Sequence, residues 1–368
     1  MKQKWAFLIM AVLLSGCAGN RKIGNAPASL KEAYKKDFFI GTALNAVQVE
    51  EKDTGAALLV PRQFNAITPE NVMKADAIHP QWERYNYKRA DDYVNYGKRR
   101  HMFIVGHTLI WHSQLPRFVH AIQSPDSLRL FMQQHISTIA SRYAGRVNSW
   151  DVVNEALNED GTLRRSVFFE KLGPSYIEEA FKLTEKAAPG TLLYYNDYNI
   201  ERPAKRRGAI ELIKQLQAAG ARIDGVGIQA HWHLGQVPFK DLEQSIIEFS
   251  ALGIKVAITE LDIDVLPRPG NTTGAEVTQK FAPAPEMNPY PNGLPAALQE
   301  QLAKDYEQLF RLLVKHRQHI SRVTFWGVHD AQSWLNNWPV PGRTNYPLLF
   351  DRQGKPKPAF DRVMAVKK

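Results

Sequence analysis

Two glutamates are the residues most suited to carry chemistry, because each follows a run of β-branched apolar residues typical of a buried parallel strand. Glu155 lies in WDVVNEA (150–156), and Glu260 lies in VAITELD (256–262). Each carboxylate is therefore expected where a strand runs out into its loop. Two carboxyls that face each other across one cleft are sufficient to break a glycosidic bond.

Further polar and aromatic residues fall near the ends of the other candidate strands. Taken singly, a strand-end glutamate is often a helix cap or an ion-pair partner, and a strand-end tryptophan is usually a core residue. Their joint placement at one end of many strands favours a shared site. These residues are Glu70, Asn71, Lys74, His107, Trp111, Asn154, Asn196, Tyr198, Gln229, His231, Asp262, Trp326 and Trp334.

The elements that must position these residues follow a regular alternation of short apolar runs and longer amphipathic stretches, the pattern of repeated βα units. About eight such units favour a single-domain α/β fold, a (β/α)₈ TIM barrel, with working residues at the carboxyl ends of its strands. An open doubly wound sheet is the competing fold, but no G-x-G-x-x-G follows the first candidate strand. The candidate strands are Phe38–Ala43, Phe64–Thr68, Met102–Gly106, Val147–Val153, Thr191–Tyr195, Gly225–Gln229, Val256–Thr259 and Arg322–Trp326.

Helix signals lie between these strands. Ser124 is a candidate N-cap and Pro125 a first helical residue, opening a helix that runs to about Tyr143. Two apolar stripes with helical spacing follow later in the chain. Residues 265–295, rich in Pro, Gly and Asn, exceed an ordinary βα loop and are expected to form part of the cleft wall. The stripes are Leu242, Ile246 and Phe249, ended by Gly253, and Leu298, Leu302, Tyr306, Leu309 and Leu313.

The N-terminal residues have the composition of an export signal. Lys2 and Lys4 precede a short apolar run, and residues 14–17 read LSGC. The run is too short to span a bilayer, and LSGC resembles the bacterial lipobox, whose cysteine becomes the lipid-bearing N-terminus. We therefore expect a lipoprotein signal peptide over residues 1–16 and a lipidated Cys17 with a polar tether over 17–30. Ala18 follows the cysteine, which favours the outer membrane of the cell envelope; ordinary cleavage with a leftover thiol is the alternative.

Composition sets limits on the rest of the chain. With 368 residues and 44% hydrophobic content, the chain can bury one large core, and we expect residues 31–368 to form one catalytic domain. The formal charge of +10 comes from scattered Lys and Arg residues, which indicates a solvated basic surface. An exported chain with no recognisable reader motif is not expected to bind nucleic acid. We expect a monomer.

Seven longer motifs, in order, make the sequence similar to glycoside hydrolase family 10 endo-β-1,4-xylanases, which are retaining enzymes built on the barrel. The similarity spans about residues 30–365. It implies that xylan or xylo-oligosaccharide is the substrate and that no cofactor or metal is needed. The motifs are FNAITPENVMK (64–74), VGHTLIWHSQ (105–114), WDVVNEA (150–156), YYNDYN (194–199), VGIQAHWH (226–233), ITELD (258–262) and TFWGVHD (324–330).

The resemblance also implies a role for each matching residue. It assigns Glu260 as the nucleophile and Glu155 as the acid/base, with Asn154 binding the 2-hydroxyl of the reacting sugar. His231 matches the family histidine beside the nucleophile, from where it can donate hydrogen bonds to Glu260 and Asp262. The substrate-binding positions are Glu70, Asn71, Lys74, His107, Trp111 and Gln114 on the non-reducing side, Tyr198 and Gln229 beside them, and Trp326 and Trp334 as aromatic walls.

Three features depart from the usual family pattern and leave the outer sugar subsites open: Ala75, His329 and the long 265–295 segment. Parts of the sequence are also compatible with two other functions. His231 with His233, and His107 with His112, superficially resemble metal ligands of a metal-dependent hydrolase. A lipid-anchored protein that binds xylan without cutting it would have a similar barrel, but it has no need of two opposed carboxylates.

Overall fold

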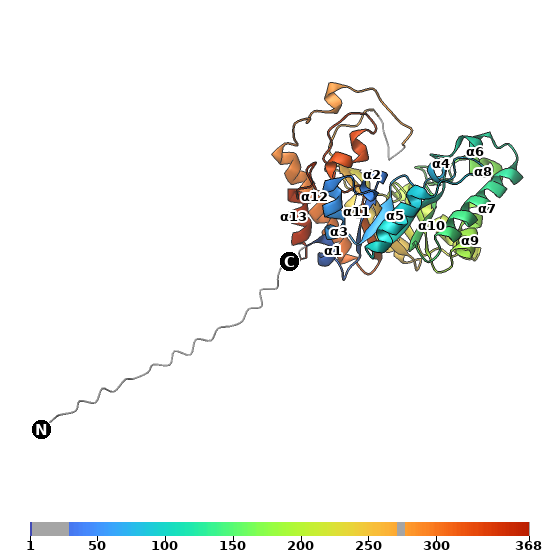
Figure 1. The fold of residues 1–368 in the computed structure, drawn as a ribbon, viewed down its shortest axis with the longest axis horizontal. Helices are drawn as coiled ribbons and strands as arrows, with labels where there is room; N and C mark the ends of the chain where they lie inside the picture. Colours follow the sequence, from blue (N-terminus) through green and yellow to red (C-terminus); the bar gives the residue numbers. More distant parts are fainter. Residues whose placement is uncertain (2–28, 271–276, 368) are drawn as a thin grey trace.

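The computed structural model describes Met1, residues 29–270 and residues 277–367. It forms a closed barrel of parallel strands, in which the first strand pairs with both the second and the last. The predicted (β/α)₈ barrel is therefore confirmed (Figure 1). Its strands are β1 (Phe39–Leu44), β2 (Ala66–Pro69), β3 (Phe103–Trp111), β4 (Ser149–Asn154), β5 (Leu192–Asp197), β6 (Gly225–Ile228), β8 (Lys255–Asp264) and β9 (Ile320–Phe325).

Every predicted strand overlaps one of these, with ends that differ by a residue or two, but β3 and β8 run well beyond their predicted ends. Strand β3 continues to Trp111 by pairing with β4 beyond an irregularity after His107. Strand β8 continues to Asp264 because a short additional strand, β7 (His231–His233), pairs with its second half. His107, Trp111, Glu260 and Asp262 therefore lie within strands, which corrects their expected position after the strand ends.

Helices surround the barrel, and the predicted helix starting at Pro125 is confirmed as α7, with the Ser124 side chain accepting a hydrogen bond from the Ser127 amide. Both predicted apolar stripes face the core, on α11 and α12. The helices are α1 (Leu30–Ala33), α2 (Ala46–Val49), α3 (Thr54–Gln63), α4 (Ala75–Ile78), α5 (Lys88–Arg99), α6 (Arg117–Ala121), α7 (Pro125–Arg142), α8 (Val167–Leu172), α9 (Tyr176–Ala187), α10 (Pro203–Ala218), α11 (Phe239–Ser250), α12 (Ala296–Lys315) and α13 (Pro358–Ala365), with 3₁₀ turns η1 (Pro285–Met287), η2 (Asp330–Gln332) and η3 (Trp334–Asn336).

Large side chains of the strands also pack against the helices outside the barrel. Trp150 on β4 is fully buried and lies over Gly106 of β3, its partner in the strand register. A Cβ atom on Gly106 would lie 2.2 Å from the Trp150 ring, so only glycine leaves room for the indole. The next residue, Asp151, points into the barrel, where it meets His107 and Arg322, so Trp150 points outward, toward Tyr143 at the end of α7.

The described parts of the 265–295 segment are tied to the chain that follows β9. An Arg343 Nη1 donates to the Pro267 carbonyl at 2.9 Å, and the Thr344 amide donates to Asn288 Oδ1 at 2.9 Å. Tyr346 donates its hydroxyl to the Tyr290 carbonyl at 2.6 Å. These contacts hold the segment against the carboxyl end of the barrel, where Figure 1 shows it as an orange loop.

The proposed signal peptide, Cys17 and most of the tether lie outside the described residues. Leu30 begins the barrel domain, where its amide donates to Gln63 Oε1 at 3.0 Å. Tyr34 donates its hydroxyl to the Val363 carbonyl of α13 at 2.6 Å, so the first and last helices of the domain are joined. Among the described residues, no helix has the length and apolar character needed to cross a membrane.

Candidate active site

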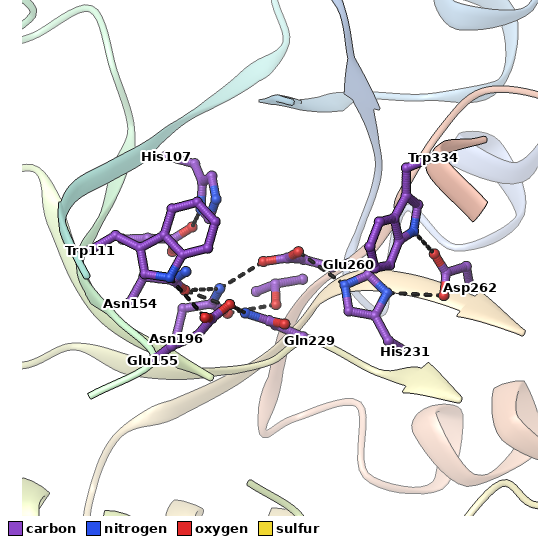
Figure 2. A network of polar contacts seen from close by, with 12 residues as sticks. His107, Trp111, Asn154, Glu155, Asn196, Gln229, His231, Glu260, Asp262 and Trp334 are labelled. Atoms are coloured by element: carbon purple, nitrogen blue, oxygen red, sulfur yellow. Dashed lines mark hydrogen bonds and ion pairs between the residues drawn. The ribbon is translucent and has the colours of Figure 1, made fainter. Parts of the chain in front are cut away.

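A cavity at the carboxyl end of the barrel brings together most of the residues that the sequence singled out. Both Glu155 and Glu260 line it, and Figure 2 shows their carboxyls with the polar side chains that surround them. Val277 of the long segment also lines the cavity, which confirms the expected contribution of that segment to the wall. The other lining residues are Glu70, Asn71, Lys74, His107, Trp111, Gln114, Asn154, Gln229, His231, Trp326 and Trp334.

Glu260 is held in its ionised form by its neighbours. One carboxylate oxygen accepts from Asn196 Nδ2 at 2.8 Å, and the other lies 3.1 Å from His231 Nε2. Burial, the largest effect, raises the pKa of Glu260, but the hydrogen bond from His231, the charges of His107 and His231 and the Asn196 bond together lower it below its ordinary value. The buried carboxylate is thus suited to act as a nucleophile.

His231 connects Glu260 to a second carboxylate behind it. Its Nδ1 atom lies 2.9 Å from Asp262 Oδ1, and Asp262 Oδ2 accepts from Trp334 Nε1 at 2.7 Å. Burial lowers the pKa of His231, but the charge and hydrogen bond of Asp262 and those of Glu260 outweigh it and raise the pKa to about 10. At neutral pH the ring is an imidazolium that donates to both carboxylates. Asp262 acts through His231, since the cavity is not lined by Asp262 itself.

Glu155 follows β4 directly, and two donors hold its carboxyl. Trp111 Nε1 donates to Oε2 at 2.7 Å, and Gln229 Nε2 donates to Oε1 at 2.9 Å. Its backbone has a φ of 56°, a left-handed conformation that non-glycine residues seldom adopt. The side chain is therefore directed into the cavity by the turn that ends the strand as well as by its two partners.

Asn196 is a central residue to which the sequence analysis gave no role beyond its strand-end position. Its Nδ2 group donates to Asn154 Oδ1 and to Glu260 Oε1, both at 2.8 Å, and its Oδ1 accepts from Thr259 at 2.7 Å. The oxygen of Asn154 is thus engaged, which leaves its NH₂ group as the donor for a ligand hydroxyl. The YYNDYN motif contains the residue, but only the pairing of β4, β5, β6 and β8 shows that it joins the two sides of the site.

One wall of the cavity is built around Lys74. Its ammonium group donates to Asn71 Oδ1 at 3.1 Å and to Gln114 Oε1 at 2.8 Å, and it lies 4.9 Å from the centre of the Trp111 ring. Burial, the largest effect, lowers the pKa of Lys74 against the opposing carboxylates. Burial likewise raises the pKa of Glu70 against the charge of Lys74. Closely spaced donors and acceptors of this kind suit the hydroxyls of an uncharged sugar.

His107 and Trp326 form the floor beside Glu260. His107 Nδ1 lies 2.9 Å from Asp151 Oδ2, and the other Asp151 oxygen accepts from the buried Arg322 at 3.4 Å. The Trp326 ring meets the edges of His107 and His231, with ring centres 5.6 and 6.3 Å apart. Trp334 stacks on Trp338 with ring centres 4.6 Å apart. The predicted aromatic wall is therefore present in the cavity.

Tyr198 is the predicted substrate-binding residue that the structure places outside this cavity lining. Its hydroxyl accepts from Arg164 at 2.8 Å, and Lys205 Nζ lies 3.7 Å from the centre of its ring. Two of the departures from the family pattern also lie apart from the carboxylates. Ala75 begins α4, and His329 Nε2 lies 2.9 Å from Asp53 Oδ2 at the start of α3.

The histidines that resemble metal ligands have other partners. His231 lies between two carboxylates, whereas His233 Nε2 lies 2.9 Å from the Leu266 carbonyl. Within the described parts of the chain, no group of three or more His, Cys, Asp or Glu side chains is arranged to hold a metal ion.

A parallel (β/α)₈ barrel with two glutamates in one cavity at the carboxyl end is the arrangement of a barrel glycoside hydrolase. The family model for Glycosyl hydrolase family 10 matches residues 29–366, and the chain belongs to this family.

Relatives and solved structures are similar to this chain over nearly its whole length. Endo-1,4-beta-xylanase A of Xylanibacter ruminicola is 41% identical over 91% of this chain and 92% of its own length. Beta-1,4-xylanase of Dictyoglomus thermophilum is 36% identical over 99% of both chains. A GH10 endoxylanase from a sugarcane soil metagenome superposes with a TM-score of 0.87 at 44% identity, covering 91% of this chain and 99% of that one. Xylanase 10B of Thermotoga petrophila, solved with xylobiose, gives a TM-score of 0.80 at 31% identity, with coverage of 92% and 97%.

Proposed function

We propose that this protein is a retaining endo-β-1,4-xylanase that hydrolyses internal bonds of xylan or xylo-oligosaccharides. The observation that carries the proposal is the pair of glutamates in one cavity, with different surroundings. Glu260 is ionised and paired with a cationic His231, whereas Glu155 is held by two neutral donors. The names of the matched relatives, which are xylanases, support the choice of substrate.

In the first step, a Glu260 oxygen attacks the anomeric carbon and the bond to the leaving oxygen breaks. Glu155 gives its proton to that oxygen, so the shortened chain leaves as an alcohol and a glycosyl ester remains on Glu260. In the second step, Glu155 takes a proton from water, whose oxygen attacks the same carbon and releases Glu260. Two inversions at one carbon retain the β configuration.

The neighbouring side chains support the charges that these steps create. His231 and Asn196 donate to Glu260 and are in place to stabilise the carboxylate as it departs. The NH₂ group of Asn154 can bind the 2-hydroxyl as the oxocarbenium-like transition state develops. Trp326 and Trp334 line the cavity. Indoles packed over the edge of a bound sugar would crowd the C6 hydroxymethyl group of a hexose and accept a pentose, which is the preference that the family resemblance implies.

Incubation with soluble xylan, in buffer containing EDTA, tests the activity. New reducing ends should form, and NMR of fresh digest should show the β-anomer first. Glu260→Ala should lower kcat by a factor of at least about 10⁴, since the variant has no nucleophile, while xylan binding persists.

Glu211→Ala is the matched control, because Glu211 lies on α10 outside the cavity, and its activity should equal that of the wild type. Absence of new reducing ends would favour a pure binding protein. Loss of activity in EDTA that Zn²⁺ restores would favour metal catalysis, and an α-anomer released first would exclude the double displacement.

We further propose that the protein is a monomer and that a lipid on Cys17 holds it to the outer membrane. The signal peptide over residues 1–16 would be cleaved off, which makes Cys17 the first residue of the mature protein. The sequence LSGC and the apolar run before it support the signal peptide and the lipid anchor.

A further inference from the structure

Glu155 has a backbone conformation that its surroundings must maintain. Its φ of 56° is disfavoured for a residue with a Cβ atom and persists only where neighbouring contacts determine it. The amide of Glu155 donates to the Asn196 carbonyl at 2.9 Å, which leaves the carbonyl of Glu155 as the other group that can anchor the turn.

Arg164 provides that anchor. Its Nε group donates to the Glu155 carbonyl at 3.0 Å, and its backbone amide donates to the Ala156 carbonyl at 2.7 Å. A short loop returns the chain to this place: Leu157 and Leu163 form an antiparallel bridge, and the Asn158 amide donates to the Thr162 carbonyl at 2.8 Å. Both carbonyls that follow β4 are therefore bound by the same arginine.

The far side of the guanidinium is also held in place. Arg164 Nη2 donates to the Tyr198 hydroxyl at 2.8 Å, and Lys205 Nζ lies 3.7 Å from the centre of the Tyr198 ring. Lys205 is fully buried and forms an ion pair with Asp197 at 2.9 Å. The arginine thus connects the turn at Glu155 to Tyr198, which follows β5, and through it to the buried Lys205 of α10, without itself lining the cavity.

We propose that Arg164 is a positioning residue, which holds the Glu155 turn so that the carboxyl stays in line with the leaving oxygen of the substrate. The proposal rests on the acid/base role of Glu155 given above. Without the bond to its carbonyl, the turn can relax toward a more common φ, which would rotate the side chain away from Trp111 and Gln229. Proton transfer to the leaving group would then become slower, whereas the nucleophilic attack by Glu260 would keep its rate.

A pair of substrates separates these two effects. Xylopentaose has a sugar leaving group that needs a proton, whereas 2,4-dinitrophenyl β-xylobioside releases a phenolate that departs without one. For Arg164→Lys and Arg164→Gln, kcat/KM should fall by about 10- to 100-fold on xylopentaose and by less than about 3-fold on the aryl glycoside. Because kcat/KM reports the steps up to release of the leaving group, the second step of the mechanism does not obscure the result.

Arg165→Gln is the matched control. This neighbouring arginine is exposed and pairs with Glu170, so both kcat/KM values should remain at the wild-type level. The ratio of the two values in one sample does not depend on the fraction of folded enzyme, so a partly unstable variant still gives an answer. Equal losses on the two substrates, or no loss on either, would overturn the positioning role. A wild-type enzyme that cleaves neither substrate would instead overturn the proposed function.

Discussion

At the scale of single residues, the site depends on charges that are buried and yet compensated. Glu260, His231 and Asp262 carry alternating charges in a row, and each touches the next. Breaking such a buried arrangement at one member leaves an uncompensated ion. The imidazolium therefore supports the ionised nucleophile and the fold together.

The pH dependence of stability follows from the directions of these pKa shifts. The pKa of His231 is raised to about 10, so its stabilising contribution is complete below the ordinary histidine value and is lost as pH rises through about 10. The pKa of Glu260 is lowered, so its contribution is present above its ordinary value and is lost as pH falls. The charges of His231 and Glu260 together stabilise the folded state at pH values above the ordinary pKa of glutamic acid and below about 10.

Replacing the imidazolium is expected to change the pH profile of the reaction. In His231→Asn, the main group that lowers the pKa of Glu260 is gone, so burial should raise that pKa and move the acid limb of kcat/KM to higher pH. The pH dependence of kcat/KM on xylopentaose measures this shift, since the position of the limb does not depend on the folded fraction. His316→Asn, on a partly exposed histidine of another surface, is the control and should keep the wild-type profile. A variant profile that coincides with wild type would refute the role of His231.

At the scale of elements, the strands of the barrel must approach closely enough to carry both glutamates to one cavity. The contact between Trp150 of β4 and Gly106 of β3 fixes this approach, because a methyl group on Gly106 has no space beside the indole. Packing between the strands and the surrounding helices is as dense as in other protein cores, so an extra atom must displace the indole or the backbone.

Gly106→Ala should lower the free energy of unfolding by about 1–3 kcal/mol, the usual cost of overpacking. Gly55→Ala in α3 provides the comparison, since the nearest atoms would lie 3.5 Å or more from its Cβ. Alanine favours a helix over glycine, so this variant should be neutral or more stable by up to about 1 kcal/mol. Urea denaturation midpoints measure both effects, and equal midpoints for the two variants would contradict the packing argument.

At the scale of the whole molecule, the chain enters the domain at one end of the barrel and the cavity lies at the other end. The domain begins with α1 at the amino ends of the strands, joined there to α3 and α13 (Figure 1). The residues that line the cavity lie at the carboxyl ends. A lipid on Cys17 would therefore hold the protein by the end opposite the site. The cleft would face away from the membrane, toward polymer in solution.

Removal of the lipid acceptor, Cys17, tests the anchoring on which this orientation depends. Cys17→Ser should move the protein from the membrane fraction to the soluble fraction, because the change removes the lipid acceptor. The value of kcat/KM on soluble xylan should stay within about 2-fold of wild type, since the site does not contact the anchored end. Fractionation of cells, followed by a reducing-end assay of each fraction, measures both quantities. A wild-type protein found only in the soluble fraction would argue against lipidation.

The local pattern of the chain was enough to predict the barrel, the start of α7 and most residues that line the cavity. Apolar periodicity, a Ser-Pro helix start and motifs around Glu155 and Glu260 depend on neighbouring residues, so they can be read along the chain. The full extent of β3 and β8 cannot be read from the local pattern, because the strands that lengthen them are distant in the sequence.

Which of these side chains meet follows from the folded arrangement of the strands and not from the local sequence. Asn196 joins Asn154 to Glu260 across 42 and 64 residues of chain, and Tyr198 binds Arg164 instead of lining the cavity. The residue types, and the strand ends that carry them, can be read from the local sequence. Contacts between these ends depend on strand register, backbone φ and side-chain direction, which are set by packing across the whole barrel and have no local pattern.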